Sequence, residues 1–397
     1  MSASLVIVLV IAGVIPLLIG AARIVLIPVA LCEICAGIAL GPFGLGWIEI
    51  DGTVRVVALL GLSFLLFVAG HEIDPRRFRG TLARHVAVSL LLSIGLALAA
   101  GAVFALLGIR GTPLLAVALL ATSLGLIVPV LADAQQRTTS VGKITIAGAS
   151  AGDITAVVLL SVGFAGTDAP LPGRVLLLAL LALAITALGA AIAGLTHSRR
   201  VTAIIQRGAD TSAQIRVRLT VLLVAGLAYV ADAVGFEAIL GAFLAGVLVR
   251  VLDPEPERTH PRYPVKLEAL GFGFLIPVFF VASGAAIDVG SLLANSSALM
   301  RVPLFLAALL IVRGVPVVAY AGEVSRREAV AVALLQATSL PFLLTAAQIG
   351  REMDLIDGET AAALVLAGLV SVLLFPAAAV SLLRTVRLVP PPLLRSR

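Results

Sequence analysis

Long apolar stretches separated by short polar breaks run through almost the whole chain. A helix needs about 20 apolar residues to cross the hydrocarbon core of a bilayer. On that length the pattern predicts thirteen spans, at residues 4–22, 24–41, 55–71, 85–108, 112–132, 143–163, 173–196, 215–233, 236–252, 266–287, 302–321, 328–350 and 357–383. The sequence therefore predicts an all-α membrane protein.

The composition agrees with a membrane protein. Of the 397 residues, 60% are hydrophobic and 13% are charged, and the mean hydropathy is +1.15. A soluble domain of this length has charged faces throughout. The 28 Lys and Arg exceed the 22 Asp and Glu, but they lie in alternate loops, so we expect a lipid bilayer and no nucleic acid as the partner.

The alternation of basic loops predicts the orientation. Cytoplasmic loops are enriched in Lys and Arg, and twenty-two of the 28 basic residues fall on one side of the predicted spans. The opposite side carries only Arg55, Arg110, Arg174, Arg301 and Arg351. We expect a multi-pass inner-membrane protein with its N-terminus outside and its C-terminus in the cytoplasm.

Two features near the N-terminus have ordinary explanations. Residues 4–21 have the length of a signal peptide, but no basic residue precedes them and Arg23 follows, so they are interpreted as a first span. Cys32 and Cys35 lie three apart in the second span. Since other ligands are missing there, they are expected to be packing residues.

Segments of the first half recur in the second half in the same order. FVAGHEID (67–74) is matched by FVASGAAID (280–288), VALLATSL (117–124) by VALLQATSL (332–340), and Glu33-x3-Gly37 by Glu237-x3-Gly241. Each pair is seven predicted spans apart, and because seven is odd the second copy enters the membrane from the opposite face. Apolar helices also match by chance, but the shared Thr-Ser and Ile-Asp pairs favour an inverted repeat, which is common in secondary transporters.

Two spans at corresponding places of the repeat carry residues that interrupt helices. Gly and Pro weaken the helical ladder and free backbone carbonyls, which a membrane tolerates only inside protein or beside a water-filled cavity. Kinked packing helices are the alternative, but recurrence in both copies favours two broken helices. The residues are Thr122, Ser123, Gly125 and Pro129 in one copy and Thr338, Ser339 and Pro341 in the other.

Asp153 lies in the middle of the span ITIAGASAGDITAVVLLSV (144–162). An ionised carboxylate at that depth costs on the order of 2.5–3.5 kcal/mol on insertion scales, so such residues are functional by default. A structural ion pair is the alternative. Gly148 and Gly152 permit close backbone approach, and Ser150 adds a hydroxyl.

Arg313 is the only cation at a similar depth. Asp153 is its leading partner, with Glu33 and Glu237 as competitors. Because arginine stays protonated, we expect Arg313 to balance charge and fix helix packing and not to carry the transported proton.

A proton and a monovalent cation could compete for Asp153. Burial favours the protonated form of a carboxylate, whereas a nearby arginine favours the ionised form. Hydroxyls of Thr122, Ser123 and Ser150, with carbonyls freed at the break, would complete an oxygen shell for a hard ion such as sodium. One carboxylate that exchanges one proton for one cation would make the exchange electroneutral.

Five segments together resemble the monovalent cation:proton antiporter-2 family, which includes sodium/proton exchangers and the Kef potassium-efflux proteins. They are LGLSFLLFVAGHEID (60–74), the Thr122-Ser123 break followed by IVPVLAD (127–133), GDITAVVLL (152–160), EAILGAFLAGVLV (237–249) and GFLIPVFFVASGAAID (273–288). The resemblance covers nearly the whole chain, and the GAFLAG and PVFF segments are fairly specific.

The resemblance implies a homodimeric antiporter of the NhaA and NapA fold, in which a core bundle with two crossed, broken helices moves as an elevator against an interface bundle. It places Asp153 on the family's ion-binding aspartate, Thr122 and Ser123 on the first broken helix, and Arg313 on a basic residue that pairs with the aspartate pair in some members. The interface bundle would take residues 1–84 and 215–296, and the core bundle 85–163 and 297–384. Residues 164–214 would form a linker helix and loop, and 385–397 a cytoplasmic tail.

The sequence departs from the family at two places. Gly152 stands where members have a polar residue before the aspartate, which fits one-for-one exchange but weakens any transfer of ion selectivity. His71 stands within Gly-His-Glu where the family has Gly-Leu-Glu. It could sense pH, but an interfacial side chain is the favoured interpretation. The short tail is not expected to hold a Kef-type nucleotide-binding domain.

The sequence thus predicts a transporter that exchanges sodium or potassium for protons, with no cofactor and no enzyme activity. A sodium-coupled symporter of organic anions, of the bile-acid type, is the near alternative because it shares crossed broken helices. An intramembrane aspartyl protease would need a second aspartate in the membrane and Gly three residues before Asp153, where this chain has Ser150. A channel is disfavoured because the inverted repeat suggests alternating access.

Overall fold

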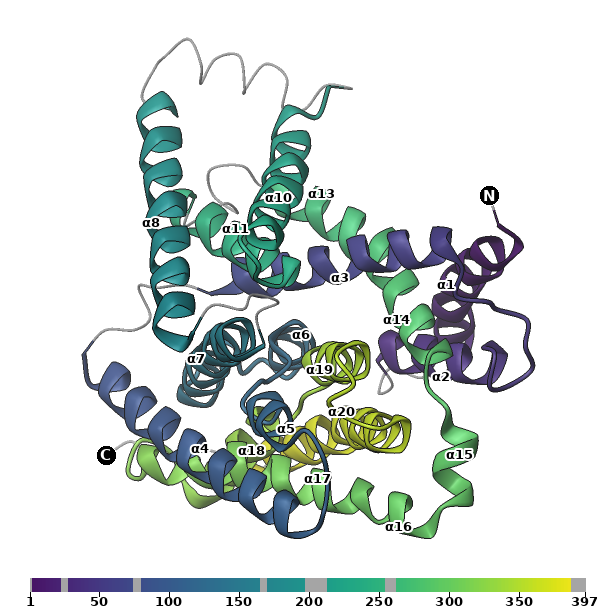
Figure 1. Ribbon diagram of the computed structural model, residues 1–397. Helices are drawn as coiled ribbons and strands as arrows, with labels where there is room; N and C mark the ends of the chain where they lie inside the picture. Colours follow the sequence, from purple (N-terminus) through teal and green to yellow (C-terminus); the bar gives the residue numbers. More distant parts are fainter. Residues whose placement is uncertain are drawn as a thin grey trace, which may run out of the picture. The chain divides into compact units, whose positions relative to one another are not determined.

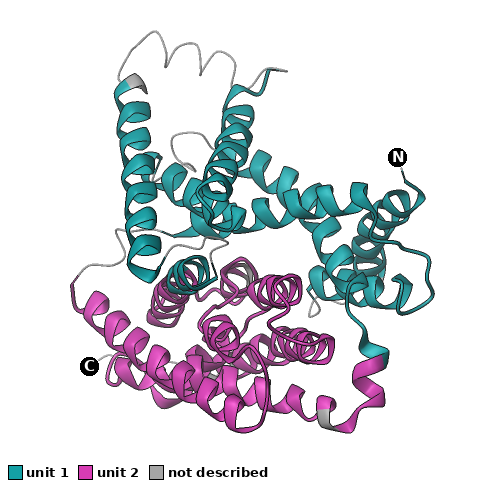
Figure 2. Cartoon of the chain, in the orientation of Figure 1, with its two compact units in different colours: residues 1–77, 154–290 teal, residues 78–153, 291–397 magenta. Residues whose placement is uncertain are grey.

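The computed structural model describes residues 2–22, 28–73, 80–164, 170–196, 213–253 and 262–386. These residues are almost entirely helical (Figure 1). The chain divides into two compact units, which Figure 2 colours separately: unit 1 comprises residues 1–77 and 154–290, and unit 2 comprises residues 78–153 and 291–397.

Unit 1 is built around the long helix α3, which packs against α11 and α14. Asp51 caps the start of α3, because its Oδ1 accepts hydrogen bonds from the Thr53 and Val54 N–H groups at 2.9 and 2.8 Å. The helices are α1 (Ala3–Ala22), α2 (Val29–Leu40), α3 (Gly52–Glu72), the last part of α7 (Ser140–Gly163), α8 (Leu171–Thr196), α10 (Ile215–Ala233), α11 (Ala238–Leu252), α13 (Arg262–Leu270), a π-helical turn (Gly271–Leu275) and α14 (Ile276–Ala285).

The glycines of the GAFLAG segment allow α11 to approach its neighbours closely. A Cβ on Gly246 would lie 2.0 Å from the Phe67 carbonyl oxygen of α3, and a Cβ on Gly241 would lie 2.0 Å from the Leu227 carbonyl oxygen of α10. Any larger residue would push these helices apart. The specific motif therefore has a packing role in unit 1.

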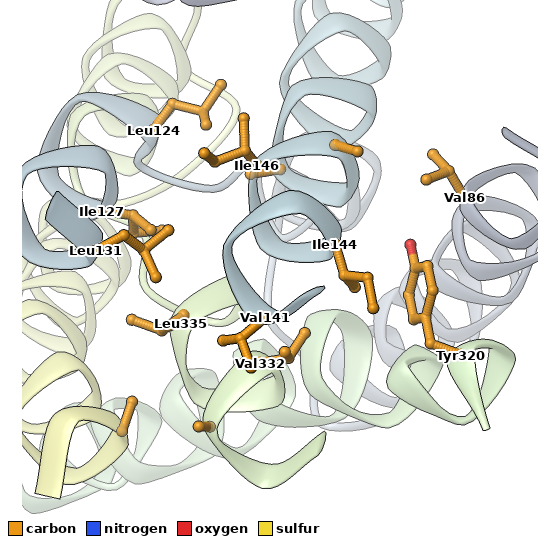
Figure 3. Close-up of a cluster of buried hydrophobic side chains, with 14 of the residues drawn as sticks. Val86, Leu124, Ile127, Leu131, Val141, Ile144, Ile146, Tyr320, Val332 and Leu335 are labelled. Carbon is orange, nitrogen blue, oxygen red and sulfur yellow. The ribbon is translucent and has the colours of Figure 1, made fainter. Parts of the chain in front are cut away.

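Unit 2 contains both copies of the Thr-Ser segment. Its helices are α4 (Gly80–Leu106), α5 (Thr112–Ala118), α6 (Leu124–Asp133), α7 as far as Asp153, most of α15 (Val289–Ala294), α16 (Ser296–Leu299), α17 (Arg301–Leu309), a π-helical turn (Leu310–Gly314), a 3-10 helix (Val315–Tyr320), α18 (Arg326–Gln336), α19 (Pro341–Glu352) and α20 (Gly358–Val386). Figure 3 shows part of its apolar core, where Ile127, Ile144 and Leu335 come from α6, α7 and α18.

Nine helical segments among the described residues are long and apolar enough to cross a membrane. The other four predicted spans do not form single long apolar helices. Two are short helices, α2 with 12 residues and α11 with 15. Residues 112–132 form the two half-helices α5 and α6, and the 19-residue α10 carries Arg216, Arg218 and Asp232.

The predicted bundles overlap the two units. Residues 1–77 and 215–290 of the predicted interface bundle lie in unit 1, together with much of the predicted linker, and most of the predicted core bundle lies in unit 2. The roles of interface and core stay predictions, and the predicted tail 385–397 lies almost wholly outside the described residues. Cys32 packs against an apolar cluster of unit 1, whereas Cys35 is exposed, and both thiols are free.

Candidate ion-binding site

Two interrupted helices meet at their breaks within unit 2. Helical structure stops at residues 119–123, between α5 and α6, and at residues 337–340, between α18 and α19. The Ser123 N–H donates to the Thr338 carbonyl at 2.9 Å, and the Leu340 N–H donates to the Ser123 hydroxyl at 2.9 Å. The Thr122 hydroxyl donates to the Gln336 carbonyl at 2.8 Å. The two breaks therefore hold each other together.

The helix ends around this crossing carry partial charges of both signs. Helices α5 and α18 end there, and α6 and α19 begin there. A helix N-terminus carries partial positive charge and a C-terminus partial negative charge. Many transporters use such half-helix ends near the bilayer midplane to bind ions.

Asp153 of α7 lies beside the first break and is only 6% exposed. Its Oδ1 accepts a hydrogen bond from the Thr122 N–H at 2.6 Å. Within the described part of the chain, no hydrogen bond reaches Oδ2. That oxygen is therefore left for a proton or a metal ion.

Arg313 is buried in the same cluster, with 1% of its surface exposed. Its Nε donates to the Thr122 hydroxyl at 3.0 Å, and one terminal nitrogen donates to the Gly148 carbonyl at 2.8 Å. It comes from the π-helical turn Leu310–Gly314, and such turns are frequent at functional sites. Pro316 is the second residue of the 3-10 helix that follows, and it has no N–H to donate to the preceding turn.

Arg313 and Asp153 interact electrostatically, but no direct salt bridge joins them among the residues described. Instead Thr122 connects them, because its N–H binds Asp153 and its hydroxyl accepts from Arg313. Asp153 is therefore the electrostatic partner of Arg313 within unit 2, with Thr122 between them. The competing acids Glu33 and Glu237 belong to unit 1, whereas the hydrogen bonds of Arg313 stay within unit 2.

Two glycines of α7 make room for this cluster. A Cβ on Gly152 would lie 2.6 Å from the Leu120 carbonyl oxygen and 2.7 Å from a terminal nitrogen of Arg313. A Cβ on Gly148 would lie 2.5 Å from Nε2 of Gln336. Gly152 therefore lets the guanidinium and the first break approach Asp153 from the same side of α7.

Of the other predicted site residues, some lie at the crossing and some only near it. Thr338 and Ser339 lie in the second break, as the repeat predicts. Ser150 does not join Asp153, because its hydroxyl donates to the Ile146 carbonyl of its own helix at 2.8 Å. Gly125 and Pro129 lie inside α6 and not in the break.

Proline still affects the backbone at two of these places. Pro129 has no N–H to donate to the Gly125 carbonyl four residues earlier. Pro341 begins α19 and does not interrupt a helix. Proline suits that first helical position because its N–H would have no helical partner there.

Three polar residues of the site were missed in the sequence. Ser93 of α4 lies 3.5 Å from a terminal nitrogen of Arg313, and the Ser371 hydroxyl of α20 binds the Ser339 backbone N–H and carbonyl at 3.2 and 3.0 Å. Gln336 contributes its carbonyl and a buried side chain. Its signal was visible, since Gln336 is the extra residue that separates VALLQATSL from VALLATSL.

Other candidate groups belong to unit 1. The His71 ring stacks on Phe67 in unit 1 at 6.0 Å between centroids. Glu33 is buried in α2, and Glu237 stands at the start of α11. Within the described ranges, no three His, Cys, Asp or Glu side chains gather as a metal centre would require.

Comparison with known proteins identifies the family. Residues 6–385 match the family described as sodium/hydrogen exchanger, transmembrane. The chain belongs to this family. The match confirms the resemblance found in the sequence.

Individual members of the sodium/hydrogen exchanger family extend the comparison. YjbQ of Bacillus subtilis (strain 168) is 30% identical, over 94% of this chain and 62% of YjbQ. A Na+/H+ antiporter of Enterococcus hirae is 29% identical, over 88% of this chain and 90% of that protein. Because the chain spans less than two thirds of YjbQ, the activity of the whole protein is treated below as a proposal.

A solved structure confirms the predicted antiporter fold. The sodium proton antiporter MjNhaP1 from Methanocaldococcus jannaschii superposes with a TM-score of 0.66 at 17% identity, over 96% of this chain and 98% of that one. The Enterococcus hirae and Methanocaldococcus jannaschii proteins are named as antiporters and not as enzymes. This favours a transporter over the intramembrane protease.

Proposed function

We propose that this exchanger-family protein exchanges a monovalent cation, sodium or potassium, for a proton at Asp153. The single observation that carries the proposal is the buried Asp153 carboxylate, which one break of the crossing binds through Oδ1 while Oδ2 stays open. A carboxylate binds a proton or a cation at the same oxygen, and the two exclude each other. The exchange is then one-for-one and electroneutral.

Thr122, Ser123 and the carbonyls at the breaks are the remaining oxygens close to this carboxylate. Their hydroxyls are already engaged, since Thr122 donates to Gln336 and Ser123 accepts from Leu340. A bound cation would therefore draw on carbonyl oxygens as well as on Asp153, as hard ions do. Arg313 balances the charge of the ionised carboxylate without carrying the proton.

The same proposal includes alternating access by an elevator movement of a core bundle, in a homodimer held together by the interface bundle. It places the protein in the cell inner membrane, with the N-terminus outside and the C-terminus in the cytoplasm. These features follow from the family resemblance and the distribution of basic residues.

The proposal is tested in proteoliposomes with an imposed pH gradient. Addition of sodium, potassium or lithium is expected to collapse the gradient, and Asp153→Asn is expected to abolish the response. Asp51→Asn, at the exposed start of α3, is the matched control and keeps it. A response that survives Asp153→Asn would refute the role of this carboxylate, and counterflow of a labelled organic anion would point to the symporter instead.

A further inference from the structure

Unit 2 contains a second set of buried polar groups between the candidate ion site and one end of the unit. The Tyr320 hydroxyl, the Thr145 hydroxyl and both polar atoms of the Gln336 amide have no hydrogen-bond partner in the described part of the chain. Their residues are 0–1% exposed. Buried polar atoms are nearly always hydrogen-bonded to protein or to ordered water, so four unpaired atoms need an explanation.

These atoms lie close to one another, although they come from different elements. The Tyr320 hydroxyl lies beside the side chains of Ser89 and Gln336, without the geometry of a hydrogen bond to either. The Gln336 amide lies against Gly148, and Thr145 stands on the same face of α7, three residues earlier. In Figure 3 the Tyr320 hydroxyl points between Ile144 and Val86, two members of the apolar core of unit 2.

The set extends to the surface at one end. His85 of α4 meets the Tyr320 ring edge-on at 6.3 Å between centroids. Its Nδ1 lies 3.6 Å from Oε1 of the exposed Glu323, just beyond hydrogen-bond distance.

At its other end the set reaches the ion site. Gln336 and Arg313 both meet α7 at Gly148: the Gln336 amide lies against its Cα, and its carbonyl accepts a hydrogen bond from the guanidinium. Arg313 in turn binds Thr122, which binds Asp153. Thr145 precedes Asp153 by eight residues, which corresponds to a rise of about 12 Å along α7.

We propose that Tyr320, Ser89, Gln336 and Thr145 hold a file of water molecules that carries the proton between the His85–Glu323 end of unit 2 and the Asp153 cluster. The proposal rests on the proposed function, in which Asp153 exchanges a proton for a cation. A water needs two to four polar partners, and these side chains supply hydroxyl and amide groups that both donate and accept.

The proton balance of this path is simple. A proton that enters from solvent joins the first water, each water passes one proton to the next, and Asp153 accepts one at the inner end as its cation leaves. The four side chains keep their own protons in the net result. A metal ion is disfavoured on this path, because none of the four side chains is anionic and a buried metal ion needs charged ligands.

The first test asks whether water contacts Tyr320, and it does not depend on transport. Hydroxyl-radical footprinting by X-ray radiolysis oxidises buried side chains that touch bound water. Tyr320 is expected to be oxidised much faster than Phe305, an equally buried aromatic side chain of unit 2 that packs on Phe104. Equal, slow oxidation of both would overturn the proposal.

The second test separates proton movement from cation movement in proteoliposomes. Tyr320→Phe and Gln336→Met are expected to slow sodium/proton exchange by at least about tenfold, while exchange of labelled for unlabelled sodium stays near the wild-type rate. Thr345→Val is the matched control, since the buried Thr345 hydroxyl donates to the Pro341 carbonyl outside this set.

Two outcomes of the second test contradict the water file. If both variants slow the two exchange modes in parallel, the residues have a structural role only. If neither mode changes, the set does not carry the proton. If the wild-type protein shows no sodium-dependent proton flux, the proposed function fails, and the footprinting result still decides whether water is present.

Discussion

At the scale of single residues, the candidate ion site depends on how closely Thr122 and Arg313 approach Asp153. Thr122 has the central position, since its N–H binds the carboxylate and its hydroxyl binds both Arg313 and the Gln336 carbonyl. These buried hydrogen bonds share one residue, so the loss of Thr122 would disturb all of them. The site therefore fixes the carboxylate through one oxygen and leaves the other open.

Gly152→Ala tests this close approach. The added Cβ would meet the Leu120 carbonyl oxygen at 2.6 Å and Arg313 at 2.7 Å, and overpacking of this kind costs about 1–3 kcal/mol. We expect a lower thermal midpoint in detergent and slower cation exchange. Gly163→Ala is the control on the same helix, where a Cβ meets nothing within 4 Å. Equal midpoints for the two variants would show that Arg313 does not fill the space beside Gly152.

The sequence predicted several members of this cluster because some residues stand out locally. Asp153 is a charge inside an apolar span, and Thr122 and Ser123 recur in the repeat. Ser93 and Ser371 each lie within an apolar run with no local signal, and they reach the site only through tertiary packing. Ser150 was assigned to the shell by its proximity in sequence, but a hydroxyl in a helix readily binds the carbonyl four residues earlier, as it does here.

At the scale of helices, the breaks were predictable but their boundaries were not. The repeat located both interruptions, whereas Gly125, Pro129 and Pro341 proved to be helical residues beside the breaks. Proline is compatible with the first turn of a helix, so its presence marks a helix start as readily as an interruption. Helix α2, with 12 residues, is shorter than the predicted span 24–41. Apolar sequence continues on both sides of it, although the helix begins after Pro28 and ends before the extended Gly41.

The junction between α17 and α20 makes a pH-dependent prediction. Partial burial of Asp357 is outweighed by hydrogen bonds from Thr360 and Arg301, which lower the pKa of this carboxyl below its ordinary value. A carboxyl with a lowered pKa in the folded state stabilises the protein above its ordinary pKa of about 3.9. That contribution is lost as the pH falls through the folded-state value.

Asp357→Asn removes the charge but keeps a residue that caps the start of α20 well. Because the Asp357 side chain is 44% exposed, we expect only a small loss at pH 7, about 0.2–1 kcal/mol. The difference in thermal midpoint from wild type should shrink as the pH is lowered towards 3. Asp354→Asn, in the exposed turn just before it, is the control. A difference that grows on acidification would contradict the assigned sign.

At the scale of the whole molecule, the described chain has two units with different internal construction. Unit 1 relies on close glycine-mediated contacts between helices, as at Gly241 and Gly246. Unit 2 contains the crossing of the two interrupted helices, with Asp153 and Arg313 buried beside it. Close packing suits a bundle that stays rigid, and polar interruptions suit a bundle that binds an ion. This contrast favours the proposed division of roles between interface and core.

A cross-linking experiment tests that division. In a background with Cys32→Ala and Cys35→Ala, single cysteines are placed at exposed positions, Leu17 of α1 in unit 1 and Leu106 of α4 in unit 2, which are 72% and 88% exposed. If unit 1 forms the homodimer interface, Leu17→Cys is expected to yield a disulfide-linked or reagent-linked dimer in membranes, whereas Leu106→Cys stays monomeric on denaturing gels. Additional positions along α1 and α4 control for side-chain direction. Dimers that form only through unit 2 would assign the interface to the unit that holds Asp153, and an elevator movement of that unit would then be excluded, because a bundle fixed at the dimer interface cannot carry the ion across the membrane.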